Sequence, residues 1–265
     1  MHEKLITVEG GITVWAVDVS PDSTRFATGT GKSEMSIWSM TKGERLVGPL
    51  RHDNDVTGAE FSPNGEQIAT ACYGASIRIF DGRNGDELIT IDTTTPQLAA
   101  TTPLAWSSDG QRIFAASKGN KISSFDVSTG SQLAELQIPS LIHSLALAPN
   151  CKFIATFTYG SIRFLDASTL AQTGPVVEEN EVMYSIAISQ DSSCAATGRG
   201  DGKIIIRNLS QILPDLYGPF HVRICTFIVP ACLTSPTLTN CVGLYSSSTT
   251  RRTTFDIKWS QRQTT

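Results

Sequence analysis

A unit of about forty residues recurs along the chain and limits the folds that are open to it. One copy, from Ser62 to Asp81, reads SPNGEQIATACYGASIRIFD, and related stretches begin at Ser20, Ser107, Ala148 and Ser189. Successive copies begin 42, 45, 41 and 41 residues apart. Because a unit of this size cannot bury its apolar face alone, we expect the copies to stack on one another.

The residues inside each unit favour strands. Each copy begins with a turn such as Ser-Pro-Asp or Ser-Pro-Asn-Gly, in which Pro presets φ and Asn or Gly tolerates the left-handed region. A short strand follows, and then a β-branched run with two-residue alternation, such as Ser76–Phe80 or Ser161–Leu165. A period of about 40–45 residues is typical of a four-stranded propeller blade. The sequence therefore predicts an all-β fold, a β-propeller with five recognisable repeats and a possible degenerate sixth blade.

The last part of the chain departs from this pattern. We expect residues 1–208 to form the blades and residues 209–265 to form an atypical tail. Strand-like runs at Val222–Val229 and Thr254–Trp259 favour a degenerate closing blade, with Lys4–Val8 as the strand that completes the ring. The loop-like run CLTSPTLTNC between them favours a poorly ordered end. The sequence leaves both interpretations open.

The units resemble WD-repeat blades, in which a Gly-His pair precedes the first strand and Trp-Asp ends the third. His52 lies four residues before Val56, where the family has its His. Asp201-Gly202 matches the tight turn before the third strand. The Trp-Asp position is occupied by Trp38-Ser39, Phe80-Asp81, Phe125-Asp126 and Leu165-Asp166. The resemblance covers roughly residues 10–208.

The resemblance implies a hydrogen-bonded set of His, Ser/Thr, Asp and Trp side chains within each blade. Structural roles follow for His52, Trp38, Asp81, Asp126, Asp166 and Asp201. No unit keeps all four members, so we expect apolar packing to hold the blades together. The phrases LVGPLRH and ILPDLYGPFH also resemble WD-repeat arrays of large fungal proteins, in which the array follows a nucleotide-binding signalling module. That resemblance implies a section, or a shorter relative, of a signalling array.

The sequence offers few groups for catalysis. It has 4 His residues and no G-x-S-x-G, H-E-x-x-H or P-loop motif. Its Gly-rich stretches, residues 28–31 and 198–202, lie between strands and lack the following helix that a phosphate cradle needs. We therefore predict a non-catalytic protein without cofactor or metal. The alternative is a propeller hydrolase or lyase with a site at the central channel, for which the first strands supply Asp18, Glu60 and His143.

Binding to another protein is the preferred interpretation. Alignment of the first strands places five residues at equivalent positions near the blade entrance: Trp15, Thr57, Thr102, His143 and Tyr184. In the resembled family this neighbourhood often contacts partners. Trp and Tyr bury a large area at little cost in side-chain entropy, so they are suited to contacting a partner. The alternative is that these side chains pack between neighbouring blades.

Composition narrows the class of partner. The net charge is −4 with a pI near 5.6, which argues against broad binding to a nucleic-acid backbone. No apolar run approaches the ~20 residues of a membrane helix, and the first residues lack the pattern of a secretory signal. We expect an intracellular protein, cytoplasmic or nuclear, with protein partners and neither nucleic acid nor membrane. An array that stays open would also expose a sheet edge and favour self-association.

Overall fold

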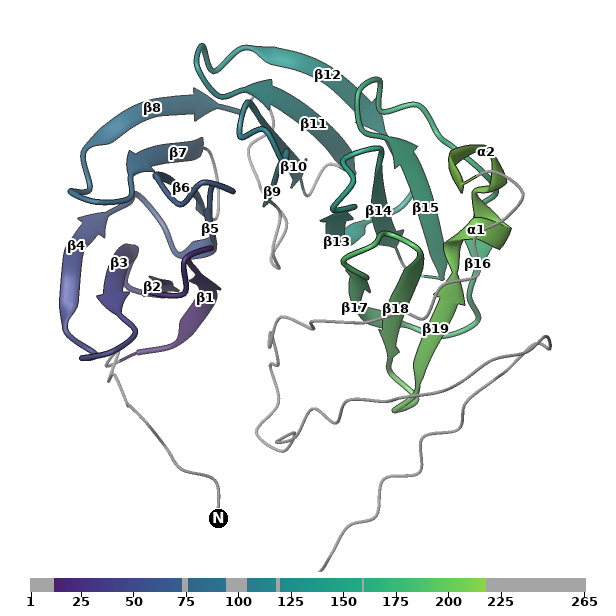
Figure 1. Cartoon of the computed structure of the whole chain (residues 1–265), viewed down its shortest axis with the longest axis horizontal. Helices are drawn as coiled ribbons and strands as arrows, with labels where there is room; N and C mark the ends of the chain where they lie inside the picture. The colour runs from purple at the N-terminus through teal and green to yellow at the C-terminus, as the bar shows by residue number, and fades with distance from the viewer. Residues whose placement is uncertain (1–11, 73–75, 94–103, 118–119, 159, 218–265) are drawn as a thin grey trace, which may run out of the picture.

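Five antiparallel sheets are arranged in an open arc in the computed structural model (Figure 1). The structure describes residues 12–72, 76–93, 104–117, 120–158 and 160–217. Four sheets have four strands each, and the fifth has three within the described residues. The predicted all-β architecture of four-stranded blades is therefore confirmed.

Within each sheet the strands follow one another in chain order, from the inner side of the arc outward. The first sheet consists of β1 (Val14–Val19), β2 (Arg25–Thr30), β3 (Glu34–Ser39) and β4 (Arg45–Arg51). The second consists of β5 (Val56–Phe61), β6 (Gln67–Cys72), β7 (Ser76–Asp81) and β8 (Glu87–Asp92). The third consists of β9 (Leu104–Trp106), β10 (Arg112–Ser117), β11 (Lys121–Asp126) and β12 (Gln132–Gln137).

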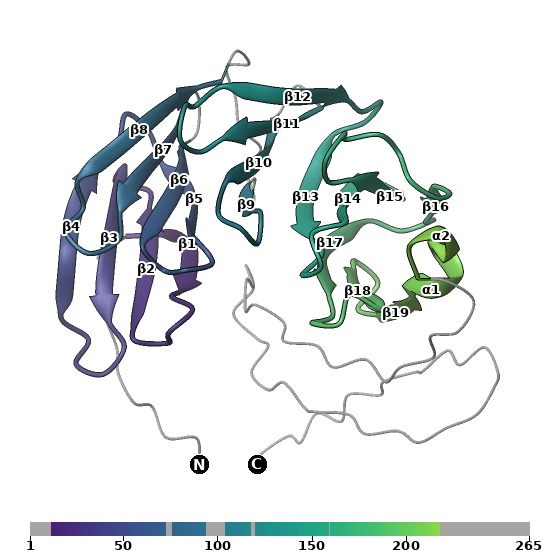
Figure 2. The ribbon, with the colours of Figure 1, turned by 45° about the horizontal axis from the view of Figure 1, so that its top comes forward.

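The remaining two sheets continue the same order. The fourth consists of β13 (Ile142–Leu147), β14 (Phe153–Thr158), β15 (Ser161–Asp166) and β16 (Val177–Glu178). The fifth consists of β17 (Met183–Ile188), β18 (Cys194–Arg199) and β19 (Ile204–Asn208). The first strands β1, β5, β9, β13 and β17 contact one another in succession and line the inner side of the arc (Figures 1 and 2).

The turn between the first two strands of each sheet explains why the repeat is visible in the sequence. In four of the five copies a serine hydroxyl accepts the backbone N–H that opens the second strand, at 2.9 Å. The four serines are Ser20, Ser62, Ser107 and Ser189. The same hydroxyl donates to the Asp or Asn two residues later, so the turn is fixed by its own side chains.

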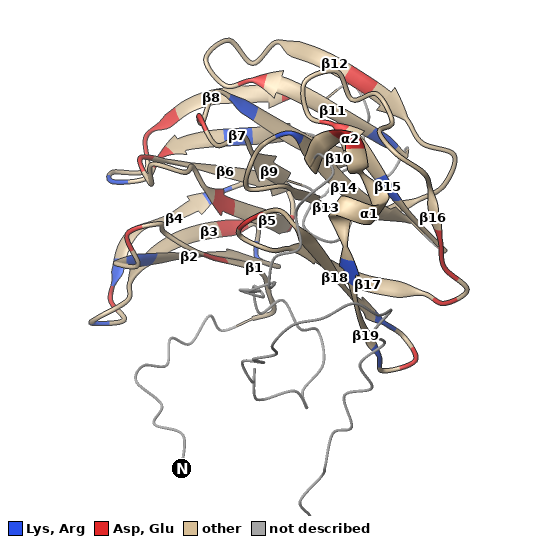
Figure 3. Ribbon diagram, turned by 45° about the vertical axis from the view of Figure 1, so that its right-hand side comes forward, with Lys and Arg blue, Asp and Glu red and all other residues tan. Residues whose placement is uncertain are grey.

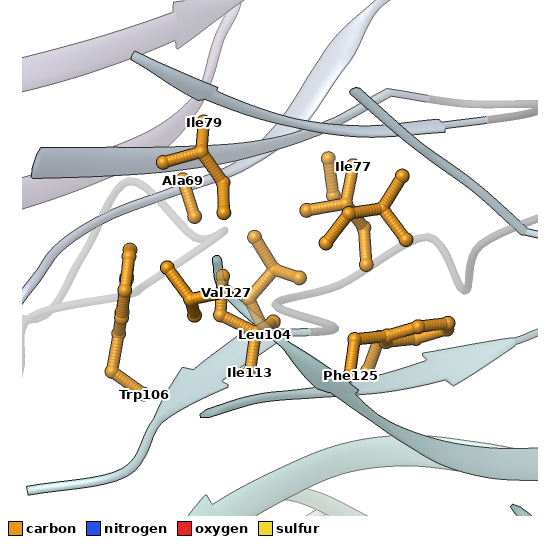
Figure 4. Close-up of a cluster of buried hydrophobic side chains, with 11 residues drawn as sticks. Ala69, Ile77, Ile79, Leu104, Trp106, Ile113, Phe125 and Val127 are labelled. Atoms are coloured by element: carbon orange, nitrogen blue, oxygen red, sulfur yellow. The ribbon is translucent and has the colours of Figure 1, made fainter. Parts of the chain in front are cut away.

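Apolar residues fill the space between successive sheets. Between the second and third sheets, Ile77 and Ile79 lie against Leu104, Trp106 and Phe125, all of them buried (Figure 4). Burying one such side chain stabilises the fold by about 1.5–3 kcal/mol. Comparable clusters join the first sheet to the second, the third to the fourth and the fourth to the fifth. Each sheet is thus held mainly by its neighbours.

Two short helices follow the fifth sheet, α1 (Leu209–Ile212) and α2 (Pro214–Tyr217). The Asn208 side chain caps α1 by accepting the backbone N–H of Ser210 at 2.9 Å. Leu209 and Leu213 are buried in the cluster between the fourth and fifth sheets. Neither helix is long enough to cross a membrane, and no other helix occurs in the described residues.

The interpretations of the two chain ends cannot be read from these elements. Lys4–Val8, Val222–Val229 and Thr254–Trp259, the segments of the predicted closing blade, all lie outside the described residues. Of the predicted tail, residues 209–217 form α1 and α2, and the rest lies outside the described part as well. The division at residue 208 therefore stays a prediction.

Candidate functional site

Four of the five first strands share a β-bulge at their second residue. The pairing with the second strand shifts between Val14 and Ala16 in the first sheet, and at the equivalent point of the second, fourth and fifth sheets. The residues inside these shifts are Trp15, Thr57, His143 and Tyr184, which we call the bulge residues. A bulge leaves one residue out of the ladder and re-aims its side chain. These four are among the five residues that the sequence singled out, and the fifth, Thr102, lies outside the described residues.

The first strands all start on the same side of the arc. Asp18, near the end of β1, accepts the backbone N–H of Phe61, the last residue of β5, at 2.7 Å. The two strands therefore run side by side in the same direction. Because the sheets repeat one order, we place the bulge residues on one rim of the inner wall.

The bulge residues differ in exposure. Tyr184 is 72% exposed and Trp15 is 45% exposed, at the two ends of the arc. Thr57 is buried, and its hydroxyl donates to the carbonyl of Ala71 at 3.4 Å. His143 is half-buried and stacks on Phe157, with ring centroids 5.9 Å apart. Burial lowers the pKa of His143, which favours its neutral form. Two aromatic side chains are thus free to meet a partner, and the other two pack on their own sheets.

Each exposed aromatic ring rests on a glycine of the neighbouring hairpin. A Cβ on Gly31 would lie 3.1 Å from Trp15 Nε1, and a Cβ on Gly200 would lie 3.2 Å from Tyr184 Cε2. Both glycine N–H groups donate to carbonyls just before the bulges, at 3.0 and 2.8 Å. The missing side chains leave room for the rings, so each ring is supported from below and stays accessible from outside.

Behind the rim, four sheets have a threonine at the fourth position of the second strand, and its hydroxyl has a different partner in each. This threonine is half-buried in the first sheet and buried in the second, fourth and fifth. In the first sheet, Trp38 Nε1 donates to Thr28 Oγ1 at 2.9 Å. In the fourth, Thr156 donates to a backbone carbonyl at 3.2 Å. In the fifth, Arg207 Nη1 donates to Thr197 Oγ1 at 2.9 Å.

In the second sheet, the threonine is Thr70, and its hydroxyl is hydrogen-bonded to the ring of His52. The Nδ1 atom of His52 lies 3.1 Å from the Leu50 carbonyl, and Nε2 lies 2.8 Å from Thr70 Oγ1. A carbonyl only accepts, so Nδ1 carries the proton and Nε2 accepts from the threonine hydroxyl. Burial lowers the pKa of His52 to about 4, which keeps the ring neutral in this role.

Comparison with known proteins agrees with this geometry. A protein-family model described as "WD domain, G-beta repeat" matches residues 3–39 and 45–81. The sequence therefore contains WD repeats, and the four-stranded antiparallel sheets agree with them. His52 and Trp38 therefore lie at WD-repeat positions, and each bonds a threonine of the kind that the repeat uses.

The chain is similar to several curated WD-repeat proteins. It is 29% identical over 155 residues to eukaryotic translation initiation factor 3 subunit I of Emericella nidulans, covering 54% of this chain and 46% of the relative. It is 24% identical over 192 residues to the serine-threonine kinase receptor-associated protein of Gallus gallus, covering 72% and 53%. It is 34% identical over 118 residues to small ribosomal subunit protein RACK1 of Drosophila melanogaster, covering 42% and 36%. The chain spans about half the length of the curated relatives it matches.

In the fifth sheet, charged residues occupy the positions that neutral side chains such as His52 occupy in the second sheet. Arg207, at the Trp position, pairs with Glu179 while it bonds Thr197. Arg199 also reaches Glu179, at 3.3 Å. These three charged side chains are largely buried, and burial lowers the pKa of Arg207. The ion pair therefore takes the place of the His and Trp groups.

Sequence reasoning missed the role of Glu179, although a signal was present. Glu179 precedes Met183, the first residue of β17, by four positions, as His52 precedes Val56. The backbone confirms this equivalence, because the N–H groups of His52, Ile138 and Glu179 donate to the turn of the preceding sheet at 2.7, 2.7 and 2.6 Å. Counting four residues back from the start of each first strand, rather than searching for His, would have identified Glu179.

The Asp residues at the ends of the third strands order the next turn. Asp126 accepts the backbone N–H groups of Ser128 and Thr129 at 3.0 and 2.8 Å, and Asp166 does the same two and three residues later. Asp81 accepts two such groups at 2.7 and 3.2 Å. Hydroxyl hydrogen bonds from Ser128 and Ser168, with these backbone bonds as a further cause, lower the pKa of Asp126 and Asp166. Asp201 instead pairs with Arg199 and Lys203, at 3.1 and 3.2 Å.

Of the three residues of the alternative enzyme site, Asp18 and Glu60 lie close together and His143 lies apart from them. Burial, with the nearby Asp18 charge as a second cause, raises the pKa of Glu60 to about 8. The carboxylate of Asp18 already accepts the Phe61 N–H. His143 belongs to the fourth sheet, two sheets beyond that of Glu60. Within the described ranges, no group of three His, Cys, Asp or Glu residues could hold a metal ion.

Proposed function

We propose that this WD-repeat protein is a non-catalytic protein-interaction scaffold whose bulge residues contact the partner. The observation that carries the proposal is the pair of exposed aromatic side chains, Trp15 and Tyr184, each in a bulge and each resting on a glycine. Bulges beside functional sites re-aim side chains, and Trp and Tyr are the residues that most often dominate binding energy. Thr102 belongs to the same proposed set by its position in the repeat.

Rigid support makes this surface suitable for binding. The sheets behind the rim are packed through continuous apolar clusters, so little backbone order is left to be acquired on binding. The names of three relatives, an initiation-factor subunit, a receptor-associated protein and a ribosomal subunit protein, describe members of assemblies. We propose that the protein and its partners act inside the cell, in the cytoplasm or nucleus.

Charges near the two aromatic residues favour a particular kind of partner. Asp53 and Asp55 lie in the connection before β5, and a Cβ on Gly31 beside Trp15 would lie 3.7 Å from Asp55 Oδ2. Glu181 is exposed three residues before Tyr184. Elsewhere acidic and basic residues are interspersed (Figure 3). A segment with Lys or Arg next to an apolar or aromatic side chain fits this arrangement.

Quantitative affinity capture tests the proposal. The protein and the Trp15→Ala, Tyr184→Ala and Leu133→Ala variants would each capture proteins from an extract of the source cells. Leu133 is about as exposed as Trp15 but lies on the outer strand β12, so it serves as the matched control. We expect each rim variant to lose at least about tenfold in affinity for a captured partner, since a central aromatic contributes about 2 kcal/mol or more. Unchanged capture by folded rim variants would exclude the rim as the binding surface.

A further inference from the structure

Every internal interface of the arc is built from the same two half-surfaces. We call the side that a sheet turns toward the next sheet its following face, and the opposite side its preceding face. Between the first and second sheets, Met35 and Ile37 on the following face of the first lie in one cluster with Ala59 and Phe61 on the preceding face of the second. Between the second and third sheets, the equivalent residues repeat the arrangement: Ile77, Ile79, Leu104 and Trp106.

Among the described residues, one half-surface of each kind has no sheet packed on it, at the two ends of the arc. On the first sheet, Val17 and Val19 occupy the positions of Ala59 and Phe61, and Val17 is 51% exposed. On the fifth sheet, Ile204 and Ile206 occupy the positions of Ile77 and Ile79, and Ile206 is 42% exposed. The equivalent residues of the second sheet are all buried. The difference comes from the presence or absence of a neighbouring sheet.

We propose that copies of this chain associate head to tail, with the following face of the fifth sheet of one copy packed on the preceding face of the first sheet of another. The contact continues an interface that the arc already forms four times, between sheets of the same repeat. A second copy is the occupant that fits, because each chain carries both complementary halves. Within one copy the two faces lie at opposite ends of the open arc (Figures 1 and 2).

The geometry of the contact predicts how assembly grows. Different surfaces meet in a head-to-tail contact, so an open assembly of any length still has one free face of each kind. Assembly therefore continues beyond a dimer as concentration rises, unless the rotation between copies closes a ring. This surface is independent of the proposed partner rim, because the side chains that carry it are valines and isoleucines of the sheet faces.

Sedimentation of the full chain over a range of concentrations tests the proposal. Val17→Glu blocks the preceding face of the first sheet, and Ile206→Glu blocks the following face of the fifth. Leu133→Glu adds the same charge at a residue that is 50% exposed on β12, outside both faces, and is the matched control. We expect the average mass of the unchanged chain and of Leu133→Glu to rise with concentration. Each end variant alone should remain a monomer, with association weakened at least about tenfold.

Mixing the two end variants gives the sharper result. Val17→Glu keeps an intact fifth sheet and Ile206→Glu keeps an intact first sheet, so an equimolar mixture should form a one-to-one dimer and nothing larger. A chain that is monomeric at every concentration would overturn the proposal, and so would association that survives either variant or a mixture that fails to form a dimer. Circular dichroism establishes that each variant is folded, and Val17→Ser and Ile206→Ser replace any variant that is not. The Trp15→Ala and Tyr184→Ala variants should assemble normally, which separates this contact from the partner rim.

Discussion

The second and fifth sheets solve the same problem with different chemistry. Each buries a threonine hydroxyl in its second strand, but the second satisfies it with the neutral ring of His52 and the fifth with the guanidinium of Arg207, which Glu179 balances. In both sheets these groups lie on the covered side: Arg207 occupies the position of Phe80, which packs toward the preceding sheet. Desolvating a single charge is unfavourable, so the guanidinium needs the carboxylate beside it, whereas the neutral ring of His52 needs no counter-charge. The position in the fold is shared, and the residue types differ.

Removing the Glu179 carboxylate should disrupt the ion pairs of the fifth sheet and cause the largest loss of stability. We expect Glu179→Gln to lower the free energy of unfolding by about 3 kcal/mol, because it removes the carboxylate that pairs with the largely buried Arg207, whereas Arg199 keeps its pair with Asp201. Chemical denaturation measures the loss, and hydrogen exchange should show faster exchange in β18 and β19 than in β6 and β7.

The matched change in the second sheet is His52→Ala. It removes one neutral hydrogen bond to Thr70 and a ring that packs edge-on against Phe80, 5.5 Å between centroids. We expect a smaller loss, about 1–2 kcal/mol, located in β6 and β7. Equal losses for the two variants would contradict the distinction between a neutral and a charged set.

The two sheets should also differ in their response to pH. Glu60 in β5 has a pKa raised by burial to about 8 from its ordinary 4.5, whereas the equivalent residue of β17 is Ala187. The folded state therefore holds a proton that the unfolded state releases, so this group contributes stability below about pH 4.5 that is lost as pH rises to about 8. We expect the stability difference between Glu60→Gln and the unchanged chain to grow with pH over this window.

The slope should be at most about 1.4 kcal/mol per pH unit in favour of the Gln variant. Denaturant midpoints at several pH values between 5 and 8 measure it, and the contribution of His52 cancels because both proteins contain it. An Ala187→Gly control should show the same pH dependence as the unchanged chain. Parallel curves for Glu60→Gln and the unchanged chain would show that Glu60 is ionised in the folded state.

The smallest expected effect sharpens the comparison at the turn. The second sheet has Gly65 at φ 70°, and the fifth has Ser192 at φ 60° at the same position of the turn. A Cβ on Gly65 would meet only ordinary contacts at 3.4 Å, so Gly65→Ser isolates the cost of the left-handed conformation. We expect a loss of about 1 kcal/mol in thermal or chemical denaturation. No loss would mean that the hydrogen bonds around the turn offset the backbone strain.

The sequence predicted the parts of this molecule that depend on local chemistry. The serine turns and the alternating strands belong to single repeats, so their period indicated five sheets of one kind. Equivalent positions in the first strands also located four bulge residues. Their exposure was not predictable from position, because Thr57 and Tyr184 occupy the same position of the repeat, yet the first is buried and the second is exposed.

The ion pair and the end faces escaped sequence reasoning for related reasons. Glu179 and Arg207 are distant in the chain and differ from the residues of the resembled pattern, so their pairing is visible only in three dimensions. Val17 and Ile206 look like any inward strand residue in the alternation. Whether such a residue is covered depends on its neighbouring sheet, and alternation carries no information about that neighbour.

A bulge residue lies outside the hydrogen-bonded ladder, so its side chain does not have to follow the alternation of the rest of its strand. The bulge positions of this arc hold Trp, Thr, His and Tyr, four side chains of different size and polarity, on the same backbone irregularity. Natural variation can therefore exchange them one at a time without disturbing strand pairing. Related chains are then able to diverge in what they recognise while they inherit an unchanged framework.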